Sequence, residues 1–111
     1  MMVWIPMRPE DSAAAARESA RLYGDHRVAH YYDADKSAGR AIARSLGGEG
    51  DVAWDTYLVY PPQSEWGDAP PPSSWVHQLR ESVWAVRARY QTGAGLVSEL
   101  QGMVRHVLRP A

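Results

Sequence analysis

The chain has 111 residues, a formal net charge of -1 and no cysteine. This length fits one domain with a modest core, and a near-neutral charge gives no broad attraction to nucleic-acid backbones or anionic lipid. The lack of cysteine excludes disulfides, thiolate metal ligands and every thiol-based redox mechanism. No apolar run approaches the roughly 20 residues that cross a bilayer, so we expect a soluble, cytoplasmic protein without nucleic-acid or membrane partners.

The first third of the chain predicts a β-α-β unit. Residues 2–7, "MVWIPM", are apolar and closed by a proline, which is typical of a short strand. Residues 8–24 predict a helix, because Asp11 or Ser12 can cap an alanine-rich stretch. Residues 27–33, "RVAHYYD", alternate β-branched and aromatic side chains with others and predict a second strand.

A second helix and a third strand follow. Asp33 or Asp35 is placed to cap a helix over residues 36–46, and Gly47 is placed to end it. Residues 52–60 are largely apolar on both of their alternating faces. A strand buried on both sides is typical of a sheet that helices cover on each face.

Residues 61–73 contain five prolines, which remove backbone donors and fix φ, so this stretch predicts a long loop. Residues 73–91 allow two interpretations. They can form one helix, or a short helix around 73–79 followed by a strand over 84–90. We favour the second, because apolar and polar residues alternate with a period of two in "WAVRARY".

The clearest amphipathic helix begins after Thr92. Its predicted core-facing residues recur at helical spacing: Leu96, Leu100, Met103 and Val107. Three further apolar residues lie beside that face: Val97, Val104 and Leu108. The complete order is β-α-β-α-β, loop, β-α in a single domain of residues 1–111. Alternating elements predict parallel pairing, and the final β-β-α adds an antiparallel edge.

This order resembles the thioredoxin-like superfamily. Three stretches carry the local resemblance: "VAHYYDADKSAGRAIARSLG", "AWDTYLVY" and "WAVRARYQTGAGLVSELQGMV". In that superfamily, a strand ending in Asp-x-Asp is followed by a helix, a Leu-Gly or similar step, two strands and a closing amphipathic helix. The resemblance covers nearly the whole chain and implies an α/β fold, a three-layer α/β/α sandwich around a mixed four-stranded sheet.

The active-site motifs of that superfamily are missing. The place of its Cys-x-x-Cys reads "RPEDS", and the proline that normally precedes the third strand is replaced by "VAWD". No catalytic residue of the superfamily therefore carries over. A second alignment also fits, because redoxin-type proteins have an extra strand and helix, carrying the thiols, before the segment that residues 3–22 resemble. The chain would then be the C-terminal part of a longer redoxin.

Three residues are candidates for acid–base chemistry. Asp55 lies in a strand that we expect to be buried, where desolvation favours the protonated carboxyl that a general acid needs. His77 and His30 would be its partners in a small hydrolase-like or lyase-like enzyme under the proline-rich loop. A structural role is the simpler interpretation of each, since no glycine-flanked serine accompanies His77.

A metal site is not expected. His26 and His30 are four residues apart on a probable strand, which is too far for two ligands of one ion. We therefore predict no metal and no cofactor.

Aromatic residues around the proline-rich loop are candidates for binding. Tyr60, Trp66 and Trp75 would give a stiff loop a large contact area at little entropic cost, unless their rings simply cover the sheet edge. Five Trp and six Tyr are more aromatic surface than a small core readily hides. Our leading hypothesis is a non-redox binding domain that pairs with itself as a homodimer or with another protein.

Overall fold

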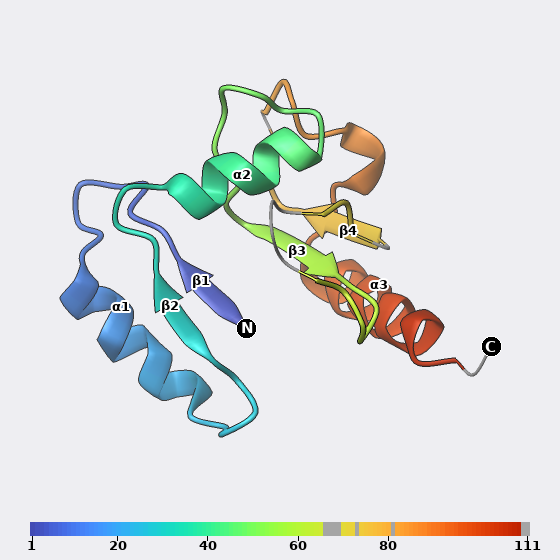
Figure 1. The fold of residues 1–111 in the computed structure, drawn as a ribbon, viewed down its shortest axis with the longest axis horizontal. Coiled ribbons are helices and arrows are strands. Elements are labelled where there is room, and N and C mark those ends of the chain that lie inside the picture. Colours follow the sequence, from blue (N-terminus) through green and yellow to red (C-terminus); the bar gives the residue numbers. More distant parts are fainter. Residues whose placement is uncertain (66–69, 73, 81, 110–111) are drawn as a thin grey trace.

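A computed structural model describes residues 1–65, 70–72, 74–80 and 82–109. Figure 1 shows two small sheets, one on each side of a linking helix, α2 (Ser37–Ser45). The described residues form a mixed α/β protein, as the sequence predicts. The radius of gyration is 14.3 Å, against about 13.2 Å for a compact domain of this length. No helix in the described ranges combines the length and apolar character that crossing a bilayer requires.

The N-terminal unit is a parallel β-α-β arrangement. Strand β1 (Met2–Trp4) pairs in parallel with β2 (His30–Tyr32), and helix α1 (Ala13–Ala20) connects them through a short 3-10 turn, η1 (Arg21–Tyr23). Helix α1 begins after Ser12, whose Oγ accepts a hydrogen bond from the Ala15 N–H at 3.0 Å. The predicted strand, helix and strand are confirmed, although both strands are shorter than expected.

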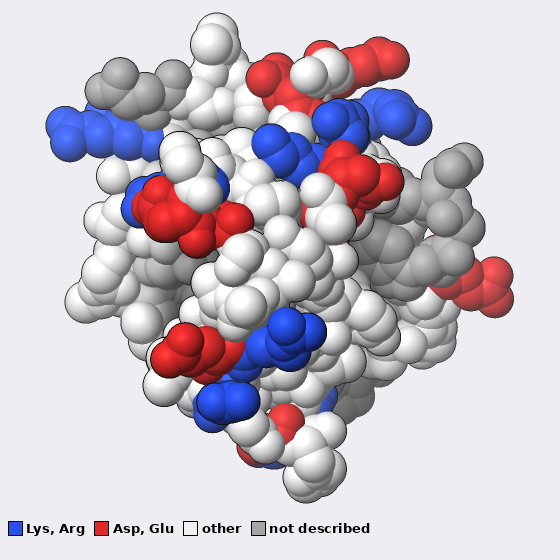
Figure 2. Space-filling model, turned by 90° about the vertical axis from the view of Figure 1, so that its left-hand side faces the viewer, with Lys and Arg blue, Asp and Glu red and all other residues white. Residues whose placement is uncertain are grey.

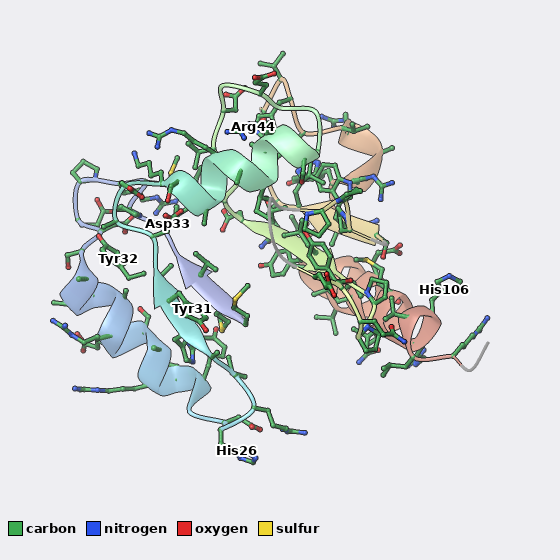
Figure 3. All side chains as sticks on the ribbon, viewed as in Figure 1. His26, Tyr31, Tyr32, Asp33, Arg44 and His106 are labelled. Atoms are coloured by element: carbon green, nitrogen blue, oxygen red, sulfur yellow. The ribbon has the colours of Figure 1, made fainter. Side chains whose placement is uncertain are left out.

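Two aspartates together begin α2. Asp33, at the end of β2 in Figure 3, is buried and accepts hydrogen bonds from the N–H groups of Ala38 at 3.2 Å and Gly39 at 2.9 Å. Asp35 accepts a bond from the Ser37 N–H at 3.1 Å. The first N–H groups of a helix have no partner within the helix, so these carboxylates satisfy them. The N-cap position itself is Lys36, with φ of 62°, so Asp33 and Asp35 supply the capping bonds from just before it.

We expect Asp33→Asn to destabilise the protein by about 1 to 3 kcal/mol, because an amide nitrogen cannot accept an N–H and one buried donor is left unpaired. Asp51→Asn is the matched control, since Asp51 is exposed and such changes stay within about 0.5 kcal/mol. Urea unfolding measures both. Equal stability of the two variants would show that the Asp33 bonds contribute nothing.

Helix α2 holds the two units together through a glycine. Gly39 is buried, and its carbonyl accepts a hydrogen bond from the Ala53 N–H at 2.9 Å. A Cβ at this position would lie 2.6 Å from both Ile5 Cδ1 and Val52 Cγ1. Ile5 follows β1 and Val52 precedes the third strand, so both units meet α2 at one point where only hydrogen fits.

The C-terminal unit is an antiparallel pair of strands against a helix. Strand β3 (Thr56–Val59) pairs with β4 (Ser74–His77), and both contact α3 (Gly93–Val107). The predicted face of α3 is confirmed. Met103 is buried, while Leu96, Leu100 and Val107 are half-buried. The described part of the proline-rich loop, 61–65 and 70–72, contains neither helix nor strand, as predicted.

Both interpretations of residues 73–91 are wrong. The predicted short helix is strand β4, and the predicted strand contains a 3-10 turn, η2 (Arg87–Arg89), with one isolated bridge from Tyr90 to His77. Three consecutive residues of β4 are buried: Trp75, Val76 and His77. Adjacent side chains of an extended strand point to opposite faces, so the burial of all three shows that both faces of β4 are covered.

The four strands form two sheets rather than the single four-stranded sheet that the sequence predicts. Among the described residues, β1 pairs with β2 alone and β3 with β4 alone. Each strand has only three or four residues, and each pair packs against its own helix, with α1 on β2 and α3 on β3 and β4. Two short ladders therefore form separately, and no hydrogen bond joins β1 to β3.

Candidate functional site

His77 lies at the centre of the C-terminal unit and is fully buried. Its Nδ1 accepts a hydrogen bond from the Leu79 N–H at 3.0 Å, so the hydrogen is on Nε2, which donates to the Val86 carbonyl at 2.7 Å. The Tyr90 ring lies 5.9 Å away, centroid to centroid. Both ring nitrogens are engaged with the backbone. His77 ties β4 to the following turn and has no nitrogen free to exchange a proton with a substrate.

An aromatic stack adjoins His77. The rings of Trp75 and Trp84 are 6.1 Å apart and nearly parallel, at 9°. The Arg89 guanidinium lies 5.3 Å from the centre of the Trp75 ring and donates to the Trp75 carbonyl at 3.1 Å. The other end of the stack contacts Gly48, where a Cβ would lie 2.7 Å from the Trp84 ring. Trp75 is 7% exposed, so this predicted binding residue forms part of the core.

His30 occupies a similar position in the N-terminal unit. Its Nδ1 accepts a hydrogen bond from the Trp4 indole N–H at 3.1 Å, and its Nε2 donates to the Tyr23 carbonyl at 3.0 Å. The Trp4 and His30 rings stack at 17°. His26 lies in the exposed loop before β2 (Figure 3). No cluster of three metal-binding side chains exists within the described ranges.

Asp55 is exposed and precedes β3, so the predicted extent of the strand is wrong, while the simpler interpretation of a solvated aspartate at the start of the strand agrees with its position. Its φ is 47°, in the left-handed region that aspartate tolerates better than most residues. The strand begins only after this turn, and the Asp55 carbonyl accepts a hydrogen bond from the Gln78 N–H at 2.9 Å. The three candidates thus lie in separate environments. Asp55 is in solvent, His30 is beside the Trp4 ring, and His77 is in the closed core.

Tyr60 and Trp66 are the two other candidate binding residues. Tyr60 is half-buried directly after β3, and burial raises its pKa above the ordinary 10.0. Trp66 lies outside the described residues. Burial first, and then the charge of Asp55, also raises the pKa of Tyr57, whose hydroxyl accepts a hydrogen bond from Gln78 at 2.8 Å.

These raised pKa values predict loss of stability at alkaline pH. A raised folded-state pKa favours the neutral phenol, so the stabilisation is complete below about pH 10 and is lost as the pH rises through the folded-state values. We expect the free energy of unfolding to fall above about pH 10, and to fall less steeply in Tyr57→Phe. Tyr31→Phe removes a hydroxyl from an exposed ring and is the control. Urea unfolding at several pH values measures this dependence. If the free energy of unfolding fell equally with pH in all three proteins, the prediction would be contradicted.

Two open hollows lie where α1 covers the first sheet. They measure about 140 and 160 Å³ and share Trp4, Ala16 and Tyr32 in their linings. Small alanine side chains on α1 leave this space above the Trp4 ring. Pockets that enclose a small organic ligand usually measure about 300 to 1,000 Å³, so neither hollow is large enough to bury one.

Sequence analysis did not predict which apolar side chains remain exposed. Val3 and Tyr31 are opposite each other in β1 and β2 and are 41% and 57% exposed. Alternation along the paired strands places Val3 and Tyr31 on the face opposite to Trp4 and Tyr32. The alternation of "VWI" and "HYYD" was a usable signal, but it does not show which face has no cover.

The fold and its side chains thus define a small mixed α/β protein in which His30 and His77 bond within the protein and several large apolar side chains stay exposed. Comparison with known proteins finds no matching family model, no matching curated protein and no matching solved structure.

Proposed function

We propose that this chain is a non-catalytic interaction domain that binds protein, either a second copy of itself or another polypeptide. The observation that carries the proposal is its accessible surface of 7996 Å². A folded monomer of 12.4 kDa is expected to expose about 6,100 Å², some 1,900 Å² less. A standard interface covers about 800 Å² on each partner, so the excess is enough for one.

Much of the exposed surface is apolar. Large apolar side chains that are more than two-fifths exposed occur in several elements: Met1, Val3, Leu22, Tyr23, Tyr31, Val83, Val86, Val97, Val104 and Leu108. Figure 2 shows acidic and basic side chains in small mixed groups on the face that carries α1, with uncharged surface between them. Val3 and Tyr31 lie side by side among these residues, and an exposed apolar patch marks a site of protein association.

The hydrogen bonds of the two buried or half-buried histidines favour binding over catalysis. His30 and His77 each use one nitrogen to accept and the other to donate within the protein. A general acid or base must reach its substrate within hydrogen-bond distance. The two histidines that sequence analysis offered for chemistry therefore stabilise the fold, and the exposed apolar side chains are available for recognition.

Sedimentation velocity over about a hundredfold range of protein concentration tests this role. We expect the weight-average sedimentation coefficient to rise with concentration, and the protein to bind a fluorescent probe of exposed apolar surface. A monomer at every concentration that binds no such probe would refute the proposal.

A second candidate is the C-terminal part of a longer redoxin-like protein. The parallel β1-α1-β2 unit and the antiparallel β3-β4-α3 unit support a relation to the thioredoxin-like sandwich, because they follow the order that superfamily shares. An added strand would bond to β1, whose second edge has no described partner. The test is genomic. An in-frame upstream sequence encoding a strand, Cys-x-x-Cys and a helix is expected, and a stop codon directly upstream would dismiss this candidate.

A further inference from the structure

Helix α3 carries a second line of mostly apolar side chains, on a part of its surface that the fold leaves exposed. Its members follow one another at steps of three, four, three and four residues, the spacing that points side chains at a partner helix in a coiled coil. They are Ala94, Val97, Gln101, Val104 and Leu108, and all five are exposed. The exposed fraction is 55% for Val97, 45% for Val104 and 67% for Leu108. We call this line the α3 seam.

The α3 seam is distinct from the face that holds α3 in the fold. That face contacts β3 and β4 and consists of Leu96, Leu100, Met103 and Val107. Since each residue turns an α-helix by about 100°, the seam is centred about 100° around the helix from that face. A helix that only covers a sheet needs a single apolar stripe, so packing within the chain does not explain the seam.

The order of residues along the seam suits a copy of itself. Val97, Gln101, Val104 and Leu108 follow one another at steps of four, three and four residues, which read the same in both directions. An antiparallel copy therefore meets the seam residue for residue. None of the four is charged, so two copies can face each other without like-charge repulsion.

The charges of α3 favour an antiparallel arrangement over a parallel one. Arg105 lies in the last turn of the helix and Arg109 follows directly after it. Two parallel helices would bring these basic ends together and align their dipoles, whereas two antiparallel helices separate the basic ends and oppose the dipoles. A second copy, running in the opposite direction, is thus the partner that both the spacing and the charges of α3 fit.

We propose that the α3 seam binds the α3 seam of a second copy, antiparallel across a two-fold axis. This inference rests on the proposed interaction role and names its site and its partner. In this dimer, Val97 of each copy meets Leu108 of the other, and Gln101 meets Val104. The two Gln101 amides lie about 4.5 Å apart along the helix axis, at about 1.5 Å per residue, and each can donate and accept a hydrogen bond. Such a polar residue fixes the register of a helix pair at a cost in affinity.

Sedimentation velocity of the full chain over about a hundredfold range of concentration tests the seam with three variants. Val104→Lys puts two ammonium groups into the central layers and should weaken dimerisation by about tenfold or more. Gln101→Leu exchanges the amide for an apolar side chain and should strengthen dimerisation by about tenfold. His106→Lys is the control and should leave dimerisation unchanged, since His106 is exposed on the side of α3 opposite to the seam.

Disulfide cross-linking tests the orientation, because the chain has no cysteine of its own. A mixture of the Val97→Cys and Leu108→Cys variants should give a linked mixed dimer on oxidation, because these two positions meet across the axis. Neither variant alone should link efficiently. An antiparallel pair holds its two copies of either position about 16 Å apart along the axis, and a disulfide needs Cα atoms within about 7 Å.

Two results would overturn the proposal. One is equal dimerisation of Val104→Lys and the wild type, and the other is linking of the Val97→Cys variant to itself as readily as to the Leu108→Cys variant. A chain that stays monomeric at every concentration but binds the fluorescent probe of apolar surface would also reject this site, while the interaction role toward another polypeptide would stand.

Discussion

His77→Ala is expected to cost about 3 to 5 kcal/mol of stability, the largest single effect in this protein. The substitution leaves the Leu79 N–H and the Val86 carbonyl without their partner and opens a cavity beside the Trp75 ring. An unpaired buried polar group costs about 1 to 3 kcal/mol, and two are created here. Urea or thermal unfolding, followed by circular dichroism, measures the loss.

His26→Ala is the matched control for this variant. The His26 side chain is 94% exposed, and a substitution there should change stability by less than about 0.5 kcal/mol. If His77→Ala were as stable as His26→Ala, the ring would not hold β4 to the following turn. The acid–base interpretation of His77 would then deserve a new test.

Gly39→Ala is expected to destabilise the protein by about 1 to 3 kcal/mol, because the added Cβ overpacks a close contact. The methyl group would meet Ile5 and Val52 at 2.6 Å and the Ala53 carbonyl oxygen at 3.2 Å. The two side chains can shift, but the carbonyl belongs to backbone that already bonds to Gly39. Since α2 contacts both units at this residue, the unfolding transition should also become less cooperative.

The same change at Gly102 should have the opposite sign. Gly102 lies in α3, and no atom lies within 4 Å of the Cβ position. Alanine in place of an unhindered helical glycine stabilises by about 0.5 to 1 kcal/mol. Chemical denaturation of both variants in parallel distinguishes packing at Gly39 from helix propensity. Stabilisation by both substitutions would show that α2 does not contact the two units as closely as described.

Local sequence signals predicted the helices well. Ser12 and the pair Asp33 and Asp35 bond to the first N–H groups of α1 and α2, and Gly47, with φ of 95°, follows α2 in the left-handed conformation. The spacing of apolar residues in α3 predicted its buried face. These features depend on residues close together in the chain, so they can be read from sequence.

The strands were harder to predict because their pairing depends on distant residues. Residues 74–77 are extended because β3 lies beside them, which no local pattern in "SSWVHQL" reveals. Asp55 turns the chain with a positive φ and shortens the predicted strand by four residues at its start. Periodicity in "WAVRARY" was misleading, because the carbonyl of Val86 is used by His77 instead of a neighbouring strand.

The candidate site could be predicted only in part. Sequence analysis offered His30 and His77 for acid–base chemistry and Trp75 for binding, but it could not show that polar atoms of these residues bond within the protein. The surplus of aromatic and apolar residues did indicate exposed apolar surface. Its position depends on which strand edges and sheet faces lack cover, which is a property of the assembled fold.

The central claim is that β1 and β3 each keep one edge without a backbone partner among the described residues, and backbone amide hydrogen exchange of the protein alone tests it most directly. Alternation along the strands turns the backbone groups of Val3 and Leu58 away from the paired strands. We predict that the Val3 and Leu58 amides exchange nearly as fast as in an unfolded chain, while the Tyr57 and Val59 amides, which face β4, are protected. Protection of Val3 and Leu58 in a monomeric sample would mean that β1 and β3 bond to each other, which would contradict the account.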